Sequence, residues 1–290
     1  MSAIPGDASA PEVHQPHRVW HSLYEVPPDF GPCVVTIGVF DGIHRGHARL
    51  IARTVEVARD LQLPALLLTF DPHPARVAGP ARNTAALSTP QRRAELAREL
   101  GADAVLVLPF TSTLADTTAH EFITRVLVET LRADTVIVGQ NFRFGAGGTG
   151  DLDTLRDLGR QFGFIAEGVD LLHTSEIRYS STHIRTCLAG GDVTAAAEAL
   201  GRPHRVAGRM AGDHLQVPTG TALPADGHYQ GMLTINGAEP WQVDVVLDRQ
   251  QVHIRPCVAP ATGMPPAELD FLRSIPAAEA KLLYRPELRD

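Results

Sequence analysis

The sequence predicts an α/β fold with a doubly wound parallel sheet, followed by a small, mostly antiparallel β-barrel-like domain with a C-terminal helix. Three observations lead to this prediction. From residue 33, short apolar runs alternate with longer amphipathic runs, which is typical of parallel strands joined by crossover helices. After about residue 203, short alternating runs are separated by turn-rich segments. Among these, Asn236-Gly237 is a strong signal for a β-hairpin turn.

The expected elements of the parallel sheet follow one another in a regular order. Five apolar runs supply the strands, at residues 33–38, 64–70, 104–108, 135–139 and 162–169. Helical spacing predicts a helix over 47–61, and Thr89-Pro90 and Gly101 mark the start and end of the next one. A capping box is expected at Thr118 and Glu121. The N-caps expected for three further helices are Asp151 (ending at Phe162), Ser181 (ending at Gly190-Gly191) and Asp192 (ending at Gly201).

The domain organisation expected from these patterns has three parts. Residues 1–30 read as a mobile tail, 31–203 as the α/β domain and 204–290 as the β domain. The β domain has candidate strands at 204–210, 228–235, 241–247 and 251–256, and a candidate terminal helix at 266–283. In the tail, His14, His17 and His21 are expected to be solvated, with weak metal binding as the alternative.

Composition excludes several classes of function. The 290 residues include 26 Lys and Arg against 33 Asp and Glu, a net charge of −7, which argues against non-specific binding to nucleic acid or anionic membranes. No apolar run approaches the roughly 18 residues of a membrane helix, and the N-terminal segment lacks the features of a secretory signal. Three widely spaced cysteines disfavour a disulfide framework. A cytoplasmic protein is therefore expected.

The most informative segment is GVFDGIHRGH at positions 38–47, between the first expected strand and helix. In an open α/β sheet, nucleotides bind at such a turn, where backbone N–H groups and the positive helix end meet phosphates. The imidazoles of His44 and His47 can donate hydrogen bonds to phosphate oxygens that gain charge during bond cleavage. The alternatives are helix-capping or surface histidines, or half of a zinc site.

Further candidate segments follow later strands. TFDPHP at 69–74 places a carboxylate and an imidazole after the second strand, with a simple β-turn as the alternative. Asn141, Phe142 and Phe144 offer an amide and apolar surface for a planar ring, although such residues also occur at buried strand ends. SSTHIR at 180–185 opens a helix with hydroxyl groups and an arginine, which is the composition of an anion site.

Together these segments resemble the HxGH nucleotidyltransferase superfamily. The Phe-Asp-Gly form of the first segment is similar to the adenylyltransferase domain of prokaryotic bifunctional riboflavin kinase/FAD synthetases. LPFT at 108–111 and VGQNFRFG at 138–145 fit the same family in order, and GRPHRV at 201–206 resembles its junction with the kinase domain. The resemblance covers roughly residues 33–210. It implies a Rossmann-like nucleotidyltransferase fold that transfers AMP from ATP to the phosphate of FMN, giving FAD and pyrophosphate by in-line attack without a covalent enzyme intermediate.

The resemblance also implies roles for individual residues, with ATP and FMN as substrates and Mg²⁺ entering with ATP. The implied catalytic residues are His44, His47 and Arg185. The implied nucleotide-binding residues are Gly38, Phe40, Asp41, Gly42, Gly46, Ser181 and Thr182. The implied flavin-binding residues are Asp71, His73, Asn141, Phe142 and Phe144. The family pattern SSTRIR is changed at one position, where His183 replaces an arginine, and Tyr179 stands where isoleucine is usual.

The β domain departs further from the family. In riboflavin kinases a Gly-rich loop leads into a Pro-Thr-Ala-Asn motif, and a later glutamate is the base. Here PTGT at 218–221 replaces that motif, leaving Thr219 and Asp244 as a possible remnant kinase site. The hypothesis is that kinase activity has been lost. Two alternatives to FAD synthesis stay open: a related nucleotidyltransferase with another nucleotide such as CTP or a modified flavin acceptor, and a non-catalytic flavin- or nucleotide-binding protein.

Overall fold

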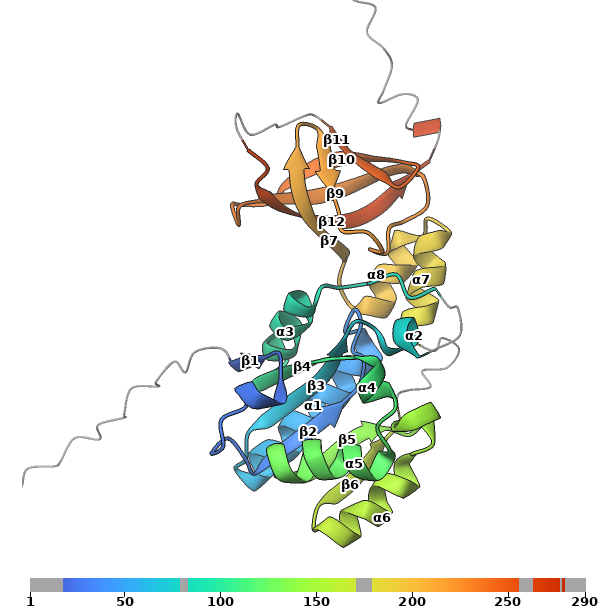
Figure 1. Ribbon diagram of the computed structural model, residues 1–290. Helices are drawn as coiled ribbons and strands as arrows, with labels where there is room; N and C mark the ends of the chain where they lie inside the picture. The colour runs from blue at the N-terminus through green and yellow to red at the C-terminus, as the bar shows by residue number, and fades with distance from the viewer. Residues whose placement is uncertain (1–17, 79–82, 171–178, 256–262, 277, 280–290) are drawn as a thin grey trace, which may run out of the picture.

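A computed structural model describes residues 18–78, 83–170, 179–255, 263–276 and 278–279. Its N-terminal part is a six-stranded sheet with the strand order β1-β4-β3-β2-β5-β6, in which every pairing is parallel (Figure 1). The strands are β1 (Arg18–Trp20), β2 (Cys33–Ile37), β3 (Ala65–Asp71), β4 (Ala104–Pro109), β5 (Ala133–Gly139) and β6 (Ile165–Val169). The chain runs from β2 outward through β3 to β4, then returns to place β5 on the other side of β2. The carboxyl end of β2 is therefore a topological switch point, where α/β sheets bind ligands.

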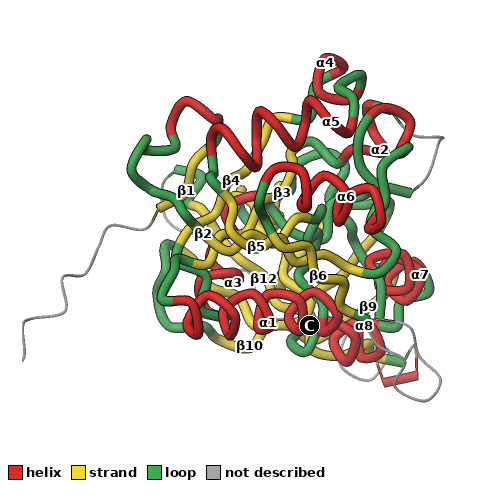
Figure 2. The backbone as a smooth tube through the Cα atoms, turned by 90° about the horizontal axis from the view of Figure 1, so that it is seen from below, coloured by secondary structure: helices red, strands yellow, loops and turns green. Residues whose placement is uncertain are grey.

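Helices cover both faces of this sheet, and Figure 2 shows the strands between them. They are α1 (Arg45–Leu61), α2 (Pro74–Val77), α3 (Pro90–Glu99), α4 (Ser112–Ala115), α5 (Ala119–Phe122), the π-helix η2 (Ile123–Thr130), α6 (Leu152–Phe162), α7 (Ser181–Ala189) and α8 (Val193–Leu200), with short 3₁₀ turns η1 (Leu23–Glu25) and η3 (Ala146–Gly148). Alternate residues of β2 point to opposite faces. Val34 packs in the cluster with α1 and α3, whereas Val35 and Ile37 pack with η2 and α6.

The second part is a closed barrel with the strand order β10-β11-β8-β7-β12-β9, every pairing antiparallel. Its strands are β7 (His204–Ala211), β8 (His214–Gln216), β9 (Gly227–Ile235), β10 (Trp241–Asp248), β11 (Gln251–Arg255) and β12 (Pro266–Ile275). The turn after β9 contains Asn236 and Gly237, both with positive φ, as the hairpin signal predicts. The predicted fold class, a doubly wound sheet followed by an antiparallel barrel, is confirmed.

The terminal helix expected at 266–283 is wrong over its first ten residues, which form strand β12 and close the barrel. Ala267, Leu269 and Phe271 are buried at every second position, so the apolar period is that of a strand. Of the remaining residues the structure describes 276, 278 and 279, the last two in a helical turn. The rest of the stretch lies outside the described residues.

Three smaller expectations also need correction. Residues 18–30, taken as part of a mobile tail, are packed on the sheet, because β1 pairs with β4 and the rings of Trp20 and Phe30 are both buried, with centroids 4.7 Å apart. The strand expected from 162 begins at Ile165, since α6 continues to Phe162. The N-cap of α7 is Ser180 rather than Ser181. Asp151, Asp192 and the Thr118–Glu121 capping box are confirmed.

Helices α7 and α8 connect the two sheets. Their buried side chains, among them Ile184, Leu188 and Ala196, belong to the same hydrophobic cluster as barrel residues such as Val206 and Leu269. Figure 1 shows both helices between the parallel sheet and the barrel. The position of α7, which carries the SSTHIR segment, is therefore determined partly by the barrel.

Candidate active site

The GVFDGIHRGH segment forms the turn from β2 into α1 at the switch point of the sheet. Phe40 and Ile43 are fully buried although both have positive φ, 50° and 35°, and Gly42 has φ 81°. Non-glycine residues rarely adopt this conformation, and packing must hold them in it. The turn is thus held in one conformation by packing, and this conformation places His44 at the start of α1.

His44 and His47 form a stacked pair at the N-terminus of α1. Their ring centroids are 3.7 Å apart and the planes differ by 17°. His44 is the N-cap, and its Nδ1 accepts a hydrogen bond of 3.3 Å from the backbone N–H of His47. An accepting Nδ1 leaves the proton of the neutral ring on Nε2. His44 therefore offers an Nε2–H donor at the positive end of the helix.

Burial keeps both imidazoles neutral. Burial, together with the smaller effect of the positive charge of Arg202, lowers the pKa of His44 to about 4. The pKa of His47 is held well below its ordinary range, first by burial and then by the neighbouring His44. The Nδ1 of His47 is buried and has no hydrogen-bond partner among the described residues. At neutral pH the two rings act on a ligand as hydrogen-bond donors and not as cations.

Asp41 belongs to this loop, and its buried carboxylate is the centre of a separate hydrogen-bond network. Its carboxylate accepts hydrogen bonds from the backbone N–H groups of Leu87 and Ser88, at 3.0 and 3.1 Å. Nη2 of Arg185 lies 2.6 Å from Oδ2, and both side chains are only 6% exposed. The Nε of Arg185 donates to the carbonyl of Ala85. Asp41 thus ties the HxGH loop to α7 instead of standing open to ligand.

The start of α7 approaches the same loop. Ser180 caps the helix, and the hydroxyl of Ser181 donates to the backbone carbonyl of Asp41 at 3.0 Å. Thr182 and Arg185 line a cavity of about 460 Å³ together with His73. His183, where the family has arginine, has its Nε2 3.5 Å from the sulfur of Cys187. The structure therefore brings Arg185, Thr182 and His73 together from motifs more than 100 residues apart.

Two arginines that sequence reasoning did not single out hold the loop in place. Arg202 donates to the carbonyls of Gly42 and Ile43, the latter at 2.9 Å. Arg93 of α3 donates to Val39 and Phe70 carbonyls and pairs with Asp71 at 3.2 Å. The sequence signal that could have found Arg93 is its position among the apolar residues of α3, where a charged side chain needs buried partners.

A second cavity, of about 520 Å³, is lined by His47 and shares Ala75 with the first. Gly38 and Phe40 contribute to it, and so do Asn141, Phe142 and Phe144 at the carboxyl end of β5. The rings of Phe142 and Phe144 are stacked with centroids 5.4 Å apart. Three of the five predicted flavin residues therefore share one apolar cavity with His47.

The other two predicted flavin residues lie elsewhere. His73 caps the short helix α2 through Nδ1 and lines the cavity of Arg185 and Thr182, and burial is the main cause of its lowered pKa. Asp71 is half-exposed and paired with Arg93. The TFDPHP segment thus stands between the two cavities, with its imidazole on the Arg185 side.

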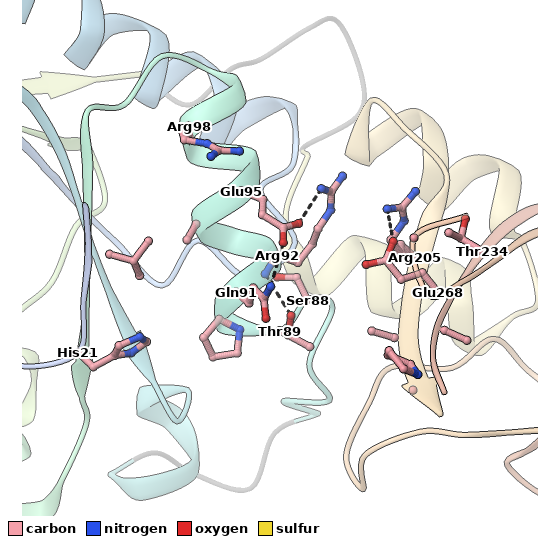
Figure 3. Close-up of a pocket in the computed structure, with 18 residues that line it drawn as sticks. His21, Ser88, Thr89, Gln91, Arg92, Glu95, Arg98, Arg205, Thr234 and Glu268 are labelled. Carbon is pink, nitrogen blue, oxygen red and sulfur yellow. Dashed lines mark hydrogen bonds and ion pairs between the residues drawn. The ribbon is translucent and has the colours of Figure 1, made fainter. Parts of the chain in front are cut away.

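A third and larger hollow, of about 1010 Å³, separates α3 from barrel strands β7 and β12 (Figure 3). It is lined by none of the residues predicted for catalysis, nucleotide binding or flavin binding. Two ion pairs lie in its lining: Arg205 lies 2.6 Å from Glu268, and Arg92 lies 3.0 Å from Glu95. We do not place a ligand there.

The possible kinase remnants lie in different parts of the barrel. Thr219 lies in the exposed loop between β8 and β9. Asp244 alternates with the buried Val243 and Val245 of β10, so it faces outward from the barrel. The pKa of Arg273 is raised mainly by its hydrogen bonds with Glu279, and the charge of Asp244 adds to this.

The described residues contain no group of three or more His, Cys, Asp or Glu side chains arranged to hold a metal ion. His14 and His17 lie outside those residues, as does Cys257, while Cys33 and Cys187 are free thiols. No helix in the described part of the chain is long and apolar enough to cross a membrane.

The doubly wound sheet, with a histidine-bearing loop-to-helix turn at its switch point, defines a nucleotide-binding α/β protein. The FAD synthetase family model matches residues 26–183. The chain belongs to this family, as the motifs predict.

Named relatives extend over most of the chain. It is 34% identical over 282 residues to the bifunctional riboflavin kinase/FMN adenylyltransferase of Pseudomonas fluorescens, covering 92% of this chain and 88% of that protein. The enzyme of the same description from Escherichia coli K12 is 36% identical over 67% of this chain and 62% of its own length. The FAD synthetase of Listeria monocytogenes is 30% identical over 78% of this chain and 93% of that protein.

The fold is also found in a solved structure. The macrolide-efflux protein of Streptococcus pneumoniae superposes with a TM-score of 0.76 at 23% identity, over 89% of this chain and 90% of that one. At this level of identity the likeness concerns the fold, including the pairing of an α/β part with a barrel.

Proposed function

We propose that the protein transfers AMP from ATP to FMN. A phosphate oxygen of FMN attacks the α-phosphorus of ATP, a new P–O bond forms, and the bond to the β-phosphate breaks, releasing pyrophosphate with the electron pair. The observation that carries the proposal is the neutral His44–His47 pair at the start of α1, next to an apolar cavity lined by Phe142. Membership of the FAD synthetase family supports the same reaction.

The proposed roles follow from two cavities that share Ala75, one of which is lined by His47. The cavity of Asn141, Phe142 and Phe144 suits a flat aromatic ring system with polar edges, because its walls combine stacked rings with an amide. The side that holds Thr182 and Arg185 suits the triphosphate, since it contains the start of α7. The reacting phosphates would then lie near His44 and His47.

In this arrangement the chain supplies no nucleophile. The Nε2–H of His44 and the N–H groups at the start of α1 donate to oxygens that gain charge in the transition state. Arg185 contributes one guanidinium whose charge is balanced by Asp41. The remaining phosphate charge is therefore assigned to Mg²⁺ arriving with ATP, with in-line positioning supplying the rest.

We further propose that the barrel does not phosphorylate riboflavin. The PTGT segment lacks the asparagine of the family motif, and its backbone is bonded to the α/β part: Ala86 N–H donates to Gly220 O at 2.7 Å. Asp244, the candidate base, faces outward from the barrel wall.

One experiment tests both proposals. The purified protein is incubated with Mg²⁺, one nucleoside triphosphate and either riboflavin or FMN, and the products are resolved by mass. FAD from FMN and ATP supports the first proposal, and a different dinucleotide or no product contradicts it. FMN from riboflavin and ATP contradicts the loss of kinase activity.

A further inference from the structure

We propose that the barrel positions the nucleotide side of the adenylyl-transfer site through residues 218–222, which we name the strap. The strap occupies the place of the kinase motif in the sequence, between β8 and β9. The proposal rests on the proposed function for the identity of the ligand, ATP, and on the following contacts for its geometry.

The strap is bonded by its backbone to a segment of the α/β part. Ala86 and Thr221 form a parallel β-bridge, in which Ala86 N–H donates to Gly220 O at 2.7 Å and Ala222 N–H donates to Ala86 O at 2.9 Å. Ala86 lies between α2 and α3 and far from the barrel in sequence. These two bonds join the two folded parts of the chain directly.

Side chains secure the strap from both sides. From the α/β part, Nη2 of Arg76 donates to the carbonyls of Thr84 and Gly220, at 2.9 and 3.2 Å. From the barrel, Nε2 of the buried His204 lies 2.7 Å from the carbonyl of Ala222. Because a carbonyl only accepts, this nitrogen carries the proton and donates. The strap is therefore held by contacts that belong to both parts.

The segment bonded to the strap leads straight to the buried ion pair. Ala85 O accepts from Nε of Arg185, and the N–H groups of Leu87 and Ser88 donate to Asp41. Three positions that flank residue 86 thus hold both members of the pair. Displacing residue 86 would move the groups that orient Arg185.

The barrel also contacts the helix that carries Arg185. Ala225 N–H donates to the carbonyl of Leu188 at 2.8 Å, one turn beyond Arg185. Ile184 and Leu188 are fully buried in the cluster shared with the barrel core. Arg185 is therefore positioned by the barrel twice, through the strap and through α7.

The flavin cavity is linked to the strap less directly. Its lining residues Pro74 and Ala75 lie beside Arg76, which donates to Gly220, whereas Phe142 and Phe144 lie in the loop after β5, whose backbone is bonded within the α/β part. A disturbance of the strap should consequently weaken the binding of ATP more than the binding of FMN. A loss of overall folding would instead reduce the fraction of protein that binds ligand, equally for ATP and for FMN.

The test compares Gly220→Ala with Gly212→Ala in the full-length protein. Both glycines lie in barrel turns with positive φ, 83° and 66°, so alanine carries a similar backbone penalty at each. A Cβ at residue 220 would lie 3.0 Å from Nη2 of Arg76, whereas a Cβ at 212 would meet no atom within 4 Å. Gly212→Ala is therefore the matched control.

Two readouts are measured, the Kd of Mg·ATP and of FMN by calorimetry, and hydrogen exchange of the peptide containing residues 85–88. We expect Gly220→Ala to weaken ATP binding on the order of tenfold, to change FMN binding less than about twofold, and to speed exchange at Leu87 and Ser88. Gly212→Ala should leave the Kd of Mg·ATP, the Kd of FMN and the exchange rates at wild-type values.

A second variant, Thr221→Val, removes the bond from its hydroxyl to Pro218 O inside the strap while keeping the shape of the side chain. This variant should also weaken ATP binding and speed exchange at Leu87 and Ser88, but by less than Gly220→Ala. Equal behaviour of the 220 and 212 variants, or equal weakening of both substrates, would overturn the proposal. If the wild type binds ATP but forms no FAD, the proposed reaction fails while the binding and exchange data still decide the role of the strap.

Discussion

Arg185 and Asp41 form a buried ion pair that joins two segments 144 residues apart, with Nη2 2.6 Å from Oδ2. Asp41 belongs to the turn that carries the histidines, and Arg185 to the helix that opens with SSTHIR. Arg185 was predicted to be catalytic and Asp41 to bind the nucleotide, and the structure joins them to each other. Asp41 balances the charge of Arg185 and fixes its direction.

The pair gives the first prediction. Asp41→Asn removes the countercharge and leaves a buried guanidinium, so it should lower the free energy of unfolding by about 3 kcal/mol. It should also reduce FAD formation strongly, since Arg185 and the loop lose their anchor. Denaturant unfolding and initial rates measure the two effects, with Asp60→Asn on the exposed side of α1 as control. A variant with wild-type stability would show that the pair contributes nothing.

The second prediction concerns His47. His47→Ala should lower the rate of adenylyl transfer by a factor on the order of 10² or more, because it removes a donor aimed at the reacting phosphates. The melting temperature should change little, since the ring lines a cavity and its Nδ1 has no partner to lose. His21→Ala, at an exposed histidine, should stay within about twofold of the wild type. Near wild-type turnover of His47→Ala would remove this residue from the mechanism.

The sequence predicted five of the six strands of the parallel sheet, all except β1, because apolar period and punctuation are local properties. Motifs at the ends of β2, β3 and β5 also supply residues that line the two cavities. The partners of those motifs were not predictable, because a contact such as that between Arg202 and Gly42 depends on tertiary packing across 160 residues. Arg93 and the strap belong to the same class of long-range contact.

Local patterns were also misread in two places. At 266–275 a strand was taken for a helix, although burial at every second residue, as at Leu269 and Phe271, is the signature of a strand. Before residue 31, Pro and charged residues hid the apolar Trp20 and Phe30, which bury themselves on the sheet. The bonds between the strap and Ala86 had no sequence signal, because they join backbone groups of two segments that lie far apart in the sequence.

The third prediction is a pH dependence of stability. Burial and Arg202 lower the pKa of His44 in the folded protein to about 4, against an ordinary value of 6.5. The unfolded chain therefore binds a proton more readily between these values, and stability falls as the pH drops from about 6.5 to about 4. Above pH 6.5 His44 is neutral in both the folded and the unfolded chain, so it does not change the free energy of unfolding with pH. The full loss is on the order of 3 kcal/mol.

Urea unfolding at a series of pH values measures this slope in the wild type and in His44→Gln. Glutamine at the N-cap can still accept from the backbone but does not titrate. We expect the variant to have a shallower decline below pH 6.5 than the wild type. Identical slopes would show that His44 is not the buried neutral group that the geometry requires.

The last prediction separates Phe142 and Phe144, two of the aromatic residues that line the proposed flavin cavity. Phe144 is 8% exposed and packs against Phe122 and Gly150 in the core, whereas Phe142 is only partly buried. Phe144→Ala should therefore cost about 3 kcal/mol of unfolding free energy through the cavity it leaves. Phe142→Ala should leave stability nearly unchanged and raise the KM for FMN about tenfold, because it removes the stacking surface. The KM for ATP is the internal control, since Phe142 does not line the cavity that holds Thr182 and Arg185. A rise in KM for both substrates, or for neither, would show that this cavity does not bind the flavin.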